Sequence, residues 1–282
     1  GEDAFMLAMA SYNKGENGSS IQLTVQRVGI ISSQVTVDYQ TGRGTAVPVQ
    51  DYQSVSGVLT FGPLETIKTI TIPIVNDQTL EPRETFSVTL DNPTNNEDIE
   101  NGRQTATISL LDDDLGSGDL LISEFRTRGR LGANDEYVKL FNPHDFDVTI
   151  FAADGSSGIT LARNDAGTLA GIATIPNLVT IRSRGHYLMT NNSPSGGFSL
   201  IDFPTGIGTL TTAGDQTFAN NIPDGADIVL LRTTDPLQFE PVNKVDSIGF
   251  AGSSWAEGNG LAPTVAANRE SCYARRLVAE AF

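Results

Sequence analysis

Short stretches in which apolar and polar residues alternate recur along most of the chain, and this pattern limits its fold more than any other feature. In the first half they cover residues 21–25, 35–39, 58–61, 68–72, 85–90 and 105–110. Turns rich in Gly, Pro, Asn and Asp separate them. Period-two segments of this length at this spacing are typical of the strands of a β-sandwich. The first half is therefore predicted to be all-β.

A second series of strand-like segments follows a short Leu-Gly-Ser-Gly stretch. It covers residues 119–125, 136–141, 148–150, 179–181, 186–189, 227–231 and 243–248. Gly and Ser between two strand-rich blocks indicate a domain boundary. We predict two immunoglobulin-like β-sandwich domains in tandem: residues 1–114, a hinge at 115–118, and 119–282 with long loops. Only the tail, residues 272–282, has a pattern that suggests a helix.

The charge balance excludes some partners. The chain has 34 acidic and 18 basic residues and a net charge of −16. Sixteen of the acidic residues but only six of the basic ones lie within residues 1–118. A nucleic-acid interface needs a basic surface, so this balance argues against nucleic acid as a partner. No apolar run approaches the roughly 18 residues of a membrane helix, so no membrane span is predicted.

Few residues in the chain suit catalysis at neutral pH. The two histidines, His144 and His186, and the single cysteine, Cys272, lie in no recognisable catalytic motif. No nucleophile elbow, HExxH motif or phosphate-binding loop is present. Paired carboxylates can hydrolyse glycosides, but we interpret the acidic residues of this chain as ion ligands. The sequence predicts a protein that is not an enzyme.

Acidic residues of the first half gather where strands begin or end. Such positions can converge on one end of a sandwich, where carboxylates would offer the roughly 6–8 oxygen ligands that calcium takes. The consecutive Asp112, Asp113 and Asp114 would repel one another if packed together without a cation. The alternative is that each loop acid is solvated and points in its own direction. A calcium site is the prediction to test.

Several motifs of the first half also resemble a Calx-beta domain. They are Glu-Asn-Gly at 16–18, Leu-Thr-Val-Gln-Arg at 23–27, Val-Thr-Val-Asp-Tyr at 35–39, Gly-Thr-Ala at 44–46 with Asp-Tyr at 51–52, Gly-Val-Leu-Thr-Phe at 57–61, Glu-Pro-Arg-Glu-Thr-Phe at 81–86 and the closing aspartates. The resemblance covers about residues 4–114. It implies a seven-stranded immunoglobulin-like sandwich that binds Ca²⁺ at one end.

Carried over position by position, the resemblance gives eight candidate calcium ligands. They are Glu16, Asp51, Asp77, Glu81, Glu84, Asp112, Asp113 and Asp114. Two residues depart from the family pattern: Asn76 stands where many members have an aspartate, and Arg43 occupies a turn position that is often acidic. Both departures reduce the negative charge near the expected site, which implies fewer ions or weaker binding.

The second half is similar to a lamin-tail domain over about residues 119–276. The resemblance lies in residues 119–129, 134–143 and 148–150 and in the closing segments 227–231, 245–250 and 271–276. It implies another immunoglobulin-like sandwich that binds or scaffolds. Arg126, Arg128 and Arg130 form the densest basic cluster, and we expect ion pairs with Asp135 and Glu136 rather than a phosphate, sulfated-glycan or protein site. The single tryptophan, Trp255, is expected to be a core or capping residue, with stacking on a sugar as the alternative.

These observations predict a calcium-binding structural or adhesive protein that is secreted or lies at the cell surface of a bacterium or archaeon. The low lysine content, four against fourteen arginines, and the start at Gly1 fit a processed exported chain. Self-association into a filament or matrix is the expected partnership. The apolar residues 5–10 are expected to pair within their own sandwich, with strand exchange to a neighbour as the alternative. The alternative function is a module that recognises a surface polysaccharide, or less favourably nucleic acid, for a secreted hydrolase or envelope complex.

Overall fold

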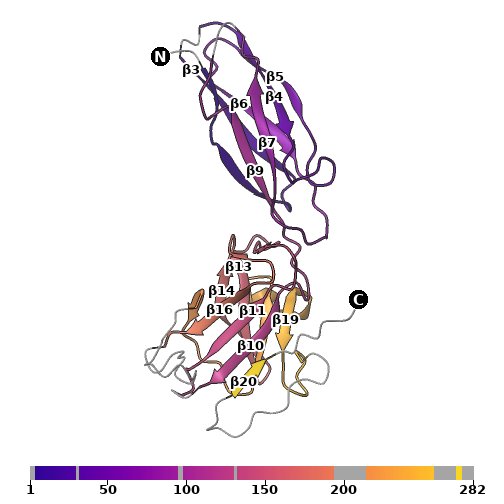
Figure 1. Cartoon of the computed structure of the whole chain (residues 1–282), viewed down its shortest axis with the longest axis vertical. Helices are drawn as coiled ribbons and strands as arrows, with labels where there is room; N and C mark the ends of the chain where they lie inside the picture. The colour runs from indigo at the N-terminus through magenta and orange to yellow at the C-terminus, as the bar shows by residue number, and fades with distance from the viewer. Residues whose placement is uncertain are drawn as a thin grey trace. The chain divides into compact units, whose positions relative to one another are not determined.

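The computed structural model describes residues 4–29, 32–94, 98–129, 132–193, 214–256 and 271–274. The chain divides into two compact units, residues 1–114 and 115–282. Each unit consists of β-strands arranged in layers, and the described residues contain two short 3₁₀ turns but no α-helix (Figure 1). Both units are immunoglobulin-like β-sandwiches, which confirms the predicted fold class. Among the described residues no helix is long and apolar enough to cross a membrane.

The first unit consists of two sheets. One has the strand order β6-β3-β1-β8, and the other has the order β2-β9-β7-β4-β5. The strands are β1 (Ala4–Leu7), β2 (Ser11–Gly15), β3 (Ser20–Val28), β4 (Val35–Gly42), β5 (Ser56–Phe61), β6 (Ile67–Pro73), β7 (Glu84–Asp91), β8 (Asp98–Ile99) and β9 (Thr105–Leu111). Alternate residues of these strands point into one core, which is why the period-two pattern locates them.

The first strand of the sandwich is split between the two sheets. β1 pairs with β3 and β8, whereas β2 pairs with β9 of the opposite sheet. This switch, together with the two-residue β8, accounts for nine strands among the described residues where the resemblance implied seven. Phe5 and Leu7 are fully buried in the core. Residues 5–7 therefore complete their own sandwich, as expected.

The second unit also contains two main sheets. One has the order β17-β16-β11-β10-β20, the other β14-β13-β18-β19, and β12 and β15 form a separate pair. The strands are β10 (Leu121–Arg128), β11 (Tyr137–Phe141), β12 (Val148–Thr149), β13 (Gly158–Asp165), β14 (Thr168–Pro176), β15 (Thr180–Ile181), β16 (His186–Asn191), β17 (Gln216–Phe218), β18 (Asp227–Leu231), β19 (Lys244–Ile248) and β20 (Ser271–Ala274). The 3₁₀ turns are η1 (Pro236–Gln238) and η2 (Pro241–Asn243).

Two predictions for the second unit can be compared with the structure. The suggested helix is wrong for residues 272–274, because they belong to β20, which pairs with β10; residues 275–282 lie outside the described part. Trp255 is 9% exposed and packs with Ala162, Val229 and Leu231, so its expected place in a core is confirmed.

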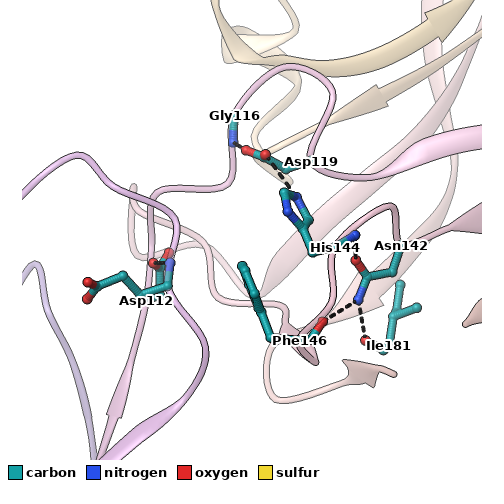
Figure 2. Close-up of polar contacts among 8 residues, drawn as sticks. Asp112, Gly116, Asp119, Asn142, His144, Phe146 and Ile181 are labelled. Atoms are coloured by element: carbon teal, nitrogen blue, oxygen red, sulfur yellow. Dashed lines mark hydrogen bonds and ion pairs between the residues drawn. The ribbon is translucent and has the colours of Figure 1, made fainter. Parts of the chain in front are cut away.

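The start of the second unit is fixed by hydrogen bonds within that unit. The carboxylate of Asp119 accepts a hydrogen bond from the Gly116 N–H at 2.7 Å and lies 3.2 Å from Nε2 of His144 (Figure 2). The Gly118 N–H donates to the carbonyl of Val245 at 2.8 Å. Of the four residues predicted as a hinge, at least Gly116 and Gly118 are thus tied to the second sandwich, and His144 has a structural partner.

Candidate metal site

The strand ends bring acidic residues of the first unit together. β2 and β9 are parallel, with Gly15 opposite Leu111, so the residues that follow them, Glu16 and Asp112, emerge side by side. Glu84 begins β7 and lies opposite Leu110 of β9, at the same end. We call this end the acidic rim. It comprises Glu16, Asp51, Glu81, Glu84, Asp112, Asp113 and Asp114.

Two groups of three carboxylates form within the acidic rim. Glu16, Asp112 and Asp114 each offer an oxygen within 4.8 Å of the others. Asp51, Glu81 and Glu84 form the second group by the same measure. Oxygens bound to one calcium at about 2.3–2.6 Å lie no more than about 5 Å apart. Each group therefore has the spacing of ligands around a single ion.

Backbone N–H groups orient the carboxylates of the acidic rim. Asp112 accepts one hydrogen bond from the Asp114 N–H at 2.7 Å and another from the Glu81 N–H. The carboxylate of Asp51 accepts one from the Val47 N–H. The Asp51 carbonyl in turn accepts the Val75 N–H at 3.0 Å, which ties its loop to the end of β6. The loop conformation therefore sets the directions of these side chains.

The two remaining predicted ligands differ from each other. Asp113 is 6% exposed, and its buried Oδ1 accepts no hydrogen bond from the described residues. A buried carboxylate oxygen without a donor is costly, and a cation would satisfy it. Asp77, which like Asp113 belongs to neither group of three, is by contrast exposed, and its Oδ1 accepts the Thr79 N–H at 2.7 Å.

Burial and mutual repulsion make the acidic rim hard to ionise without a cation. Burial, reinforced by the charges of Asp112 and other rim carboxylates, raises the pKa of Glu16 to about 8. Burial likewise raises the pKa of Asp112 to about 7, although two backbone hydrogen bonds oppose this. The pKa of Glu84 rises to about 7 through burial and its hydrogen bond with Asp51. A bound cation would remove this penalty.

These pKa values predict how the metal-free first unit responds to pH. Glu16 has an ordinary pKa near 4.5 when unfolded and about 8 when folded, so the folded state holds more protons across this interval. Stability must then fall as the pH rises from about 5 to 8. We expect the urea midpoint of the first unit, measured in EDTA, to decrease steadily over this range. A midpoint that rises with pH would contradict the arrangement of the rim.

The basic cluster of the second unit is occupied by ion pairs. Arg126 pairs with the fully buried Asp135, which confirms one expected pair, and Arg128 pairs with Asp224 at 2.8 Å. Arg130 lies outside the described residues. Between the described residues, no ion pair of the expected kind joins Glu136 to Arg126 or Arg128. The carboxylate of Glu136 instead accepts hydrogen bonds from the side chain of Asn191 at 2.7 Å and from the Ile222 N–H at 2.8 Å.

Comparison with known proteins assigns the unit that carries the acidic rim. The family model of the Calx-beta domain matches residues 2–114. Residues 2–114 form a Calx-beta domain. Sodium/calcium exchanger 1 of Mus musculus is 35% identical over 121 residues, which cover 37% of this chain and 12% of the exchanger. The sodium/calcium exchanger Calx of Drosophila melanogaster is 32% identical over 103 residues, covering 36% of this chain and 11% of that exchanger.

Solved structures similar to this chain include domains of Calx. The apo form of the Calx CBD1 domain has 29% sequence identity and a TM-score of 0.39, and it covers 40% of this chain and 100% of that chain. The calcium binding domain CBD12 of CALX1.1 has 20% identity and a TM-score of 0.40, covering 65% of this chain and 79% of that chain. Because the curated relatives match over only about a tenth of their length, the comparison concerns the Calx-beta domain and not a transporter.

The sequence did not reveal what positions the predicted calcium ligands of the Calx-beta domain. The N–H groups of Val47, Glu81 and Asp114 orient two of the carboxylates. Any residue except proline offers an N–H, so no residue type marks these positions. A local signal existed only for Asp77 and Asp112, whose carboxylates accept the N–H two residues further along the chain, a turn that aspartate commonly forms.

Proposed function

We propose that the first unit is the calcium-binding module of a non-enzymatic extracellular protein with a structural or adhesive role at a microbial surface. The observation that carries the proposal is the pair of carboxylate groups in the acidic rim, whose spacing suits two ions. The buried Asp113 Oδ1, for which the described residues provide no donor, supports it independently. Asp113 would complete the ligand set, whereas Asp77 would contribute its charge from the edge of the rim.

The donor set favours calcium over transition metals. All six carboxylates in the two groups supply hard oxygen ligands, and neither group contains histidine or cysteine. Zinc prefers nitrogen and sulfur ligands in tetrahedral sites, whereas calcium takes many oxygens in flexible geometry. Magnesium demands a tighter octahedral arrangement and keeps much of its water. The remaining calcium ligands would come from second carboxylate oxygens, carbonyls and water.

The composition supports an exported chain that associates with copies of itself. A net charge of −16 and only four lysines among the eighteen basic residues suit a secreted or surface protein of a bacterium or archaeon. Calcium would neutralise the most acidic end of the first unit, where repulsion between copies would otherwise be strongest. A calcium-dependent filament or matrix is the form of self-association that we propose.

We propose that the second unit, over about residues 119–276, is a lamin-tail domain that acts as a scaffold. A role in polysaccharide recognition is less well supported, because the arginines and the tryptophan that could form a polysaccharide-binding surface are paired with acidic residues or buried. Arg126 and Arg128 are paired with aspartates, and Trp255 is buried. Neither the basic cluster nor the tryptophan thus offers an open binding surface among the described residues.

Electron microscopy tests the structural role. We expect purified protein in millimolar CaCl₂ to form fibres or a matrix visible by negative stain, and the same sample in EDTA to be dispersed. Millimolar MgCl₂ is the control and should leave the protein dispersed, because magnesium fits the carboxylate groups poorly. Dispersed particles in calcium would contradict the filament while leaving calcium binding to be measured separately.

A further inference from the structure

The second unit presents an apolar projection beside an apolar hollow, far along the chain from the acidic rim. The hollow, about 490 Å³ in volume, is lined by ten residues, none of which is charged. Phe239 and Pro236 line it together with β14, where Gly171 leaves room because it has no side chain. A Cβ at Gly171 would lie 3.6 Å from the Phe239 ring and 3.2 Å from Thr160. This hollow is large enough for an aliphatic side chain.

Leu237, the neighbour of the lining residue Pro236, projects into solvent. Its side chain is 85% exposed, and Val242 in the following 3₁₀ turn is 69% exposed. Scattered single apolar residues are common on protein surfaces, but Leu237 lies between Pro236 and Gln238 in a segment whose residues Pro236 and Phe239 line an uncharged hollow. The surface formed by the hollow, η1 and η2 is here called the apolar face.

The segment that carries Leu237 is held in place by hydrogen bonds. Asp235 caps η1 by accepting the Leu237 N–H at 3.0 Å. The Asn243 side chain donates to the Gln238 carbonyl at 2.9 Å, and Arg232 donates to the Val242 carbonyl at 3.0 Å. Presenting Leu237 on a fixed turn lowers the ordering cost of binding. This fixed projection suits insertion into a partner.

We propose that the apolar face binds a second copy of this chain, with Leu237 of each copy inserted into the hollow of the other. A surface with both a projection and a hollow is complementary to itself under two-fold symmetry, which closes as a dimer. The face also avoids the repulsion expected between chains of net charge −16. The hollow is uncharged, and the segment from Arg232 to Lys244 that carries η1 and η2 contains Asp235 and Glu240, so two acids and two bases balance along it.

The dimer is independent of the calcium site proposed above. All residues of the apolar face belong to the second unit, and the acidic rim belongs to the first. This dimer should therefore form in EDTA, where the calcium-dependent filament or matrix proposed above is absent. A dimer formed only in calcium would overturn the assignment, and it would do so without affecting the proposed calcium function.

Sedimentation velocity of the full chain from about 1 to 200 µM tests the proposal. We expect a concentration-dependent dimer in EDTA and a rise of at least tenfold in its dissociation constant for Leu237→Glu. The matched control is Leu64→Glu, which makes the same change at a leucine of the first unit that is 77% exposed. A monomer across the range, or equal weakening by the two variants, would overturn the proposal.

A second variant tests the hollow instead of the projection. Gly171→Val is expected to fill part of the hollow with the valine side chain and so to weaken the dimer as strongly as Leu237→Glu. Fluorescence of Trp255, which packs in the same cluster as Phe239, shows whether the second unit remains folded. If Gly171→Val is folded and dimerises like the unchanged protein, the hollow is not the binding site and the proposal fails.

Discussion

Calcium is expected to raise the midpoint of thermal unfolding of the first unit by roughly 10–20 °C. An ion that binds only the folded state stabilises it by about 2.7 kcal/mol at a hundred times its dissociation constant. For a domain of this size each kcal/mol shifts the midpoint by about 4–8 °C. The expected shift is large because the ion also relieves the repulsion among buried carboxylates such as Glu16 and Asp112.

Differential scanning calorimetry in EDTA and then in millimolar CaCl₂ measures this shift. The second unit provides an internal control, because Trp255 is the single tryptophan of the chain and its fluorescence follows that unit. The midpoint temperature reported by tryptophan fluorescence, which follows the second unit, should not change. The midpoint temperature of the first unit should rise. An unchanged first-unit midpoint would mean that the rim carboxylates bind no calcium under these conditions.

Replacing Glu16 by glutamine is expected to remove at least half of the calcium-induced shift. Glu16 is 4% exposed and supplies one of three carboxylates in its group. Glutamine keeps the shape but removes the charge that attracts the ion. In EDTA at pH 8 the variant should be as stable as the unchanged protein or more stable, since it buries no carboxylate at that position. Loss of calcium response without loss of stability identifies a ligand.

Two further variants make the Glu16→Gln result specific. Glu100→Gln makes the same change at an exposed residue outside the rim and should keep the full calcium response. Asp77→Asn should keep most of it, because Asp77 belongs to neither carboxylate group. If Asp77→Asn and Glu16→Gln reduce the response equally, the division of the rim into two groups is wrong.

Strands with one buried face were predictable from their alternation, whereas strands with two buried faces were recognised only in part: β18 was predicted, as the mainly aliphatic run 227–231, and β13 was not. Residues 21–25 and 85–90 alternate cleanly, and they lie within β3 and β7. The hairpin of β13 and β14 was missed. The first five residues of β13 are all buried, because the strand lies between β14 and β18 with a second apolar cluster on its outer side. Burial on both faces removes the alternation that marks a strand.

The candidate site was also predictable only in part. Acids at strand ends could be identified, but their grouping depends on which strands are neighbours. Glu16 lies beside Asp112 because β2 pairs in parallel with β9, which lies more than ninety residues further along the chain. The spacing of acidic residues along the sequence does not indicate which strands pair. The resemblance to Calx-beta domains supplied the eight predicted ligands, and the structure brings six of them together in two groups of three, leaving Asp77 and Asp113 outside the groups.

The parallel pairing of β2 with β9 also determines how the first unit would bear mechanical load. Tension that pulls the chain apart at Ser11 and at Leu111 draws these two strands in opposite directions along their length. Their hydrogen bonds run across that direction, so they are sheared together instead of opening one at a time. The group formed by Glu16, Asp112 and Asp114 lies at the end of this pair. An ion bound there would join the two strands at the end where the force enters β9.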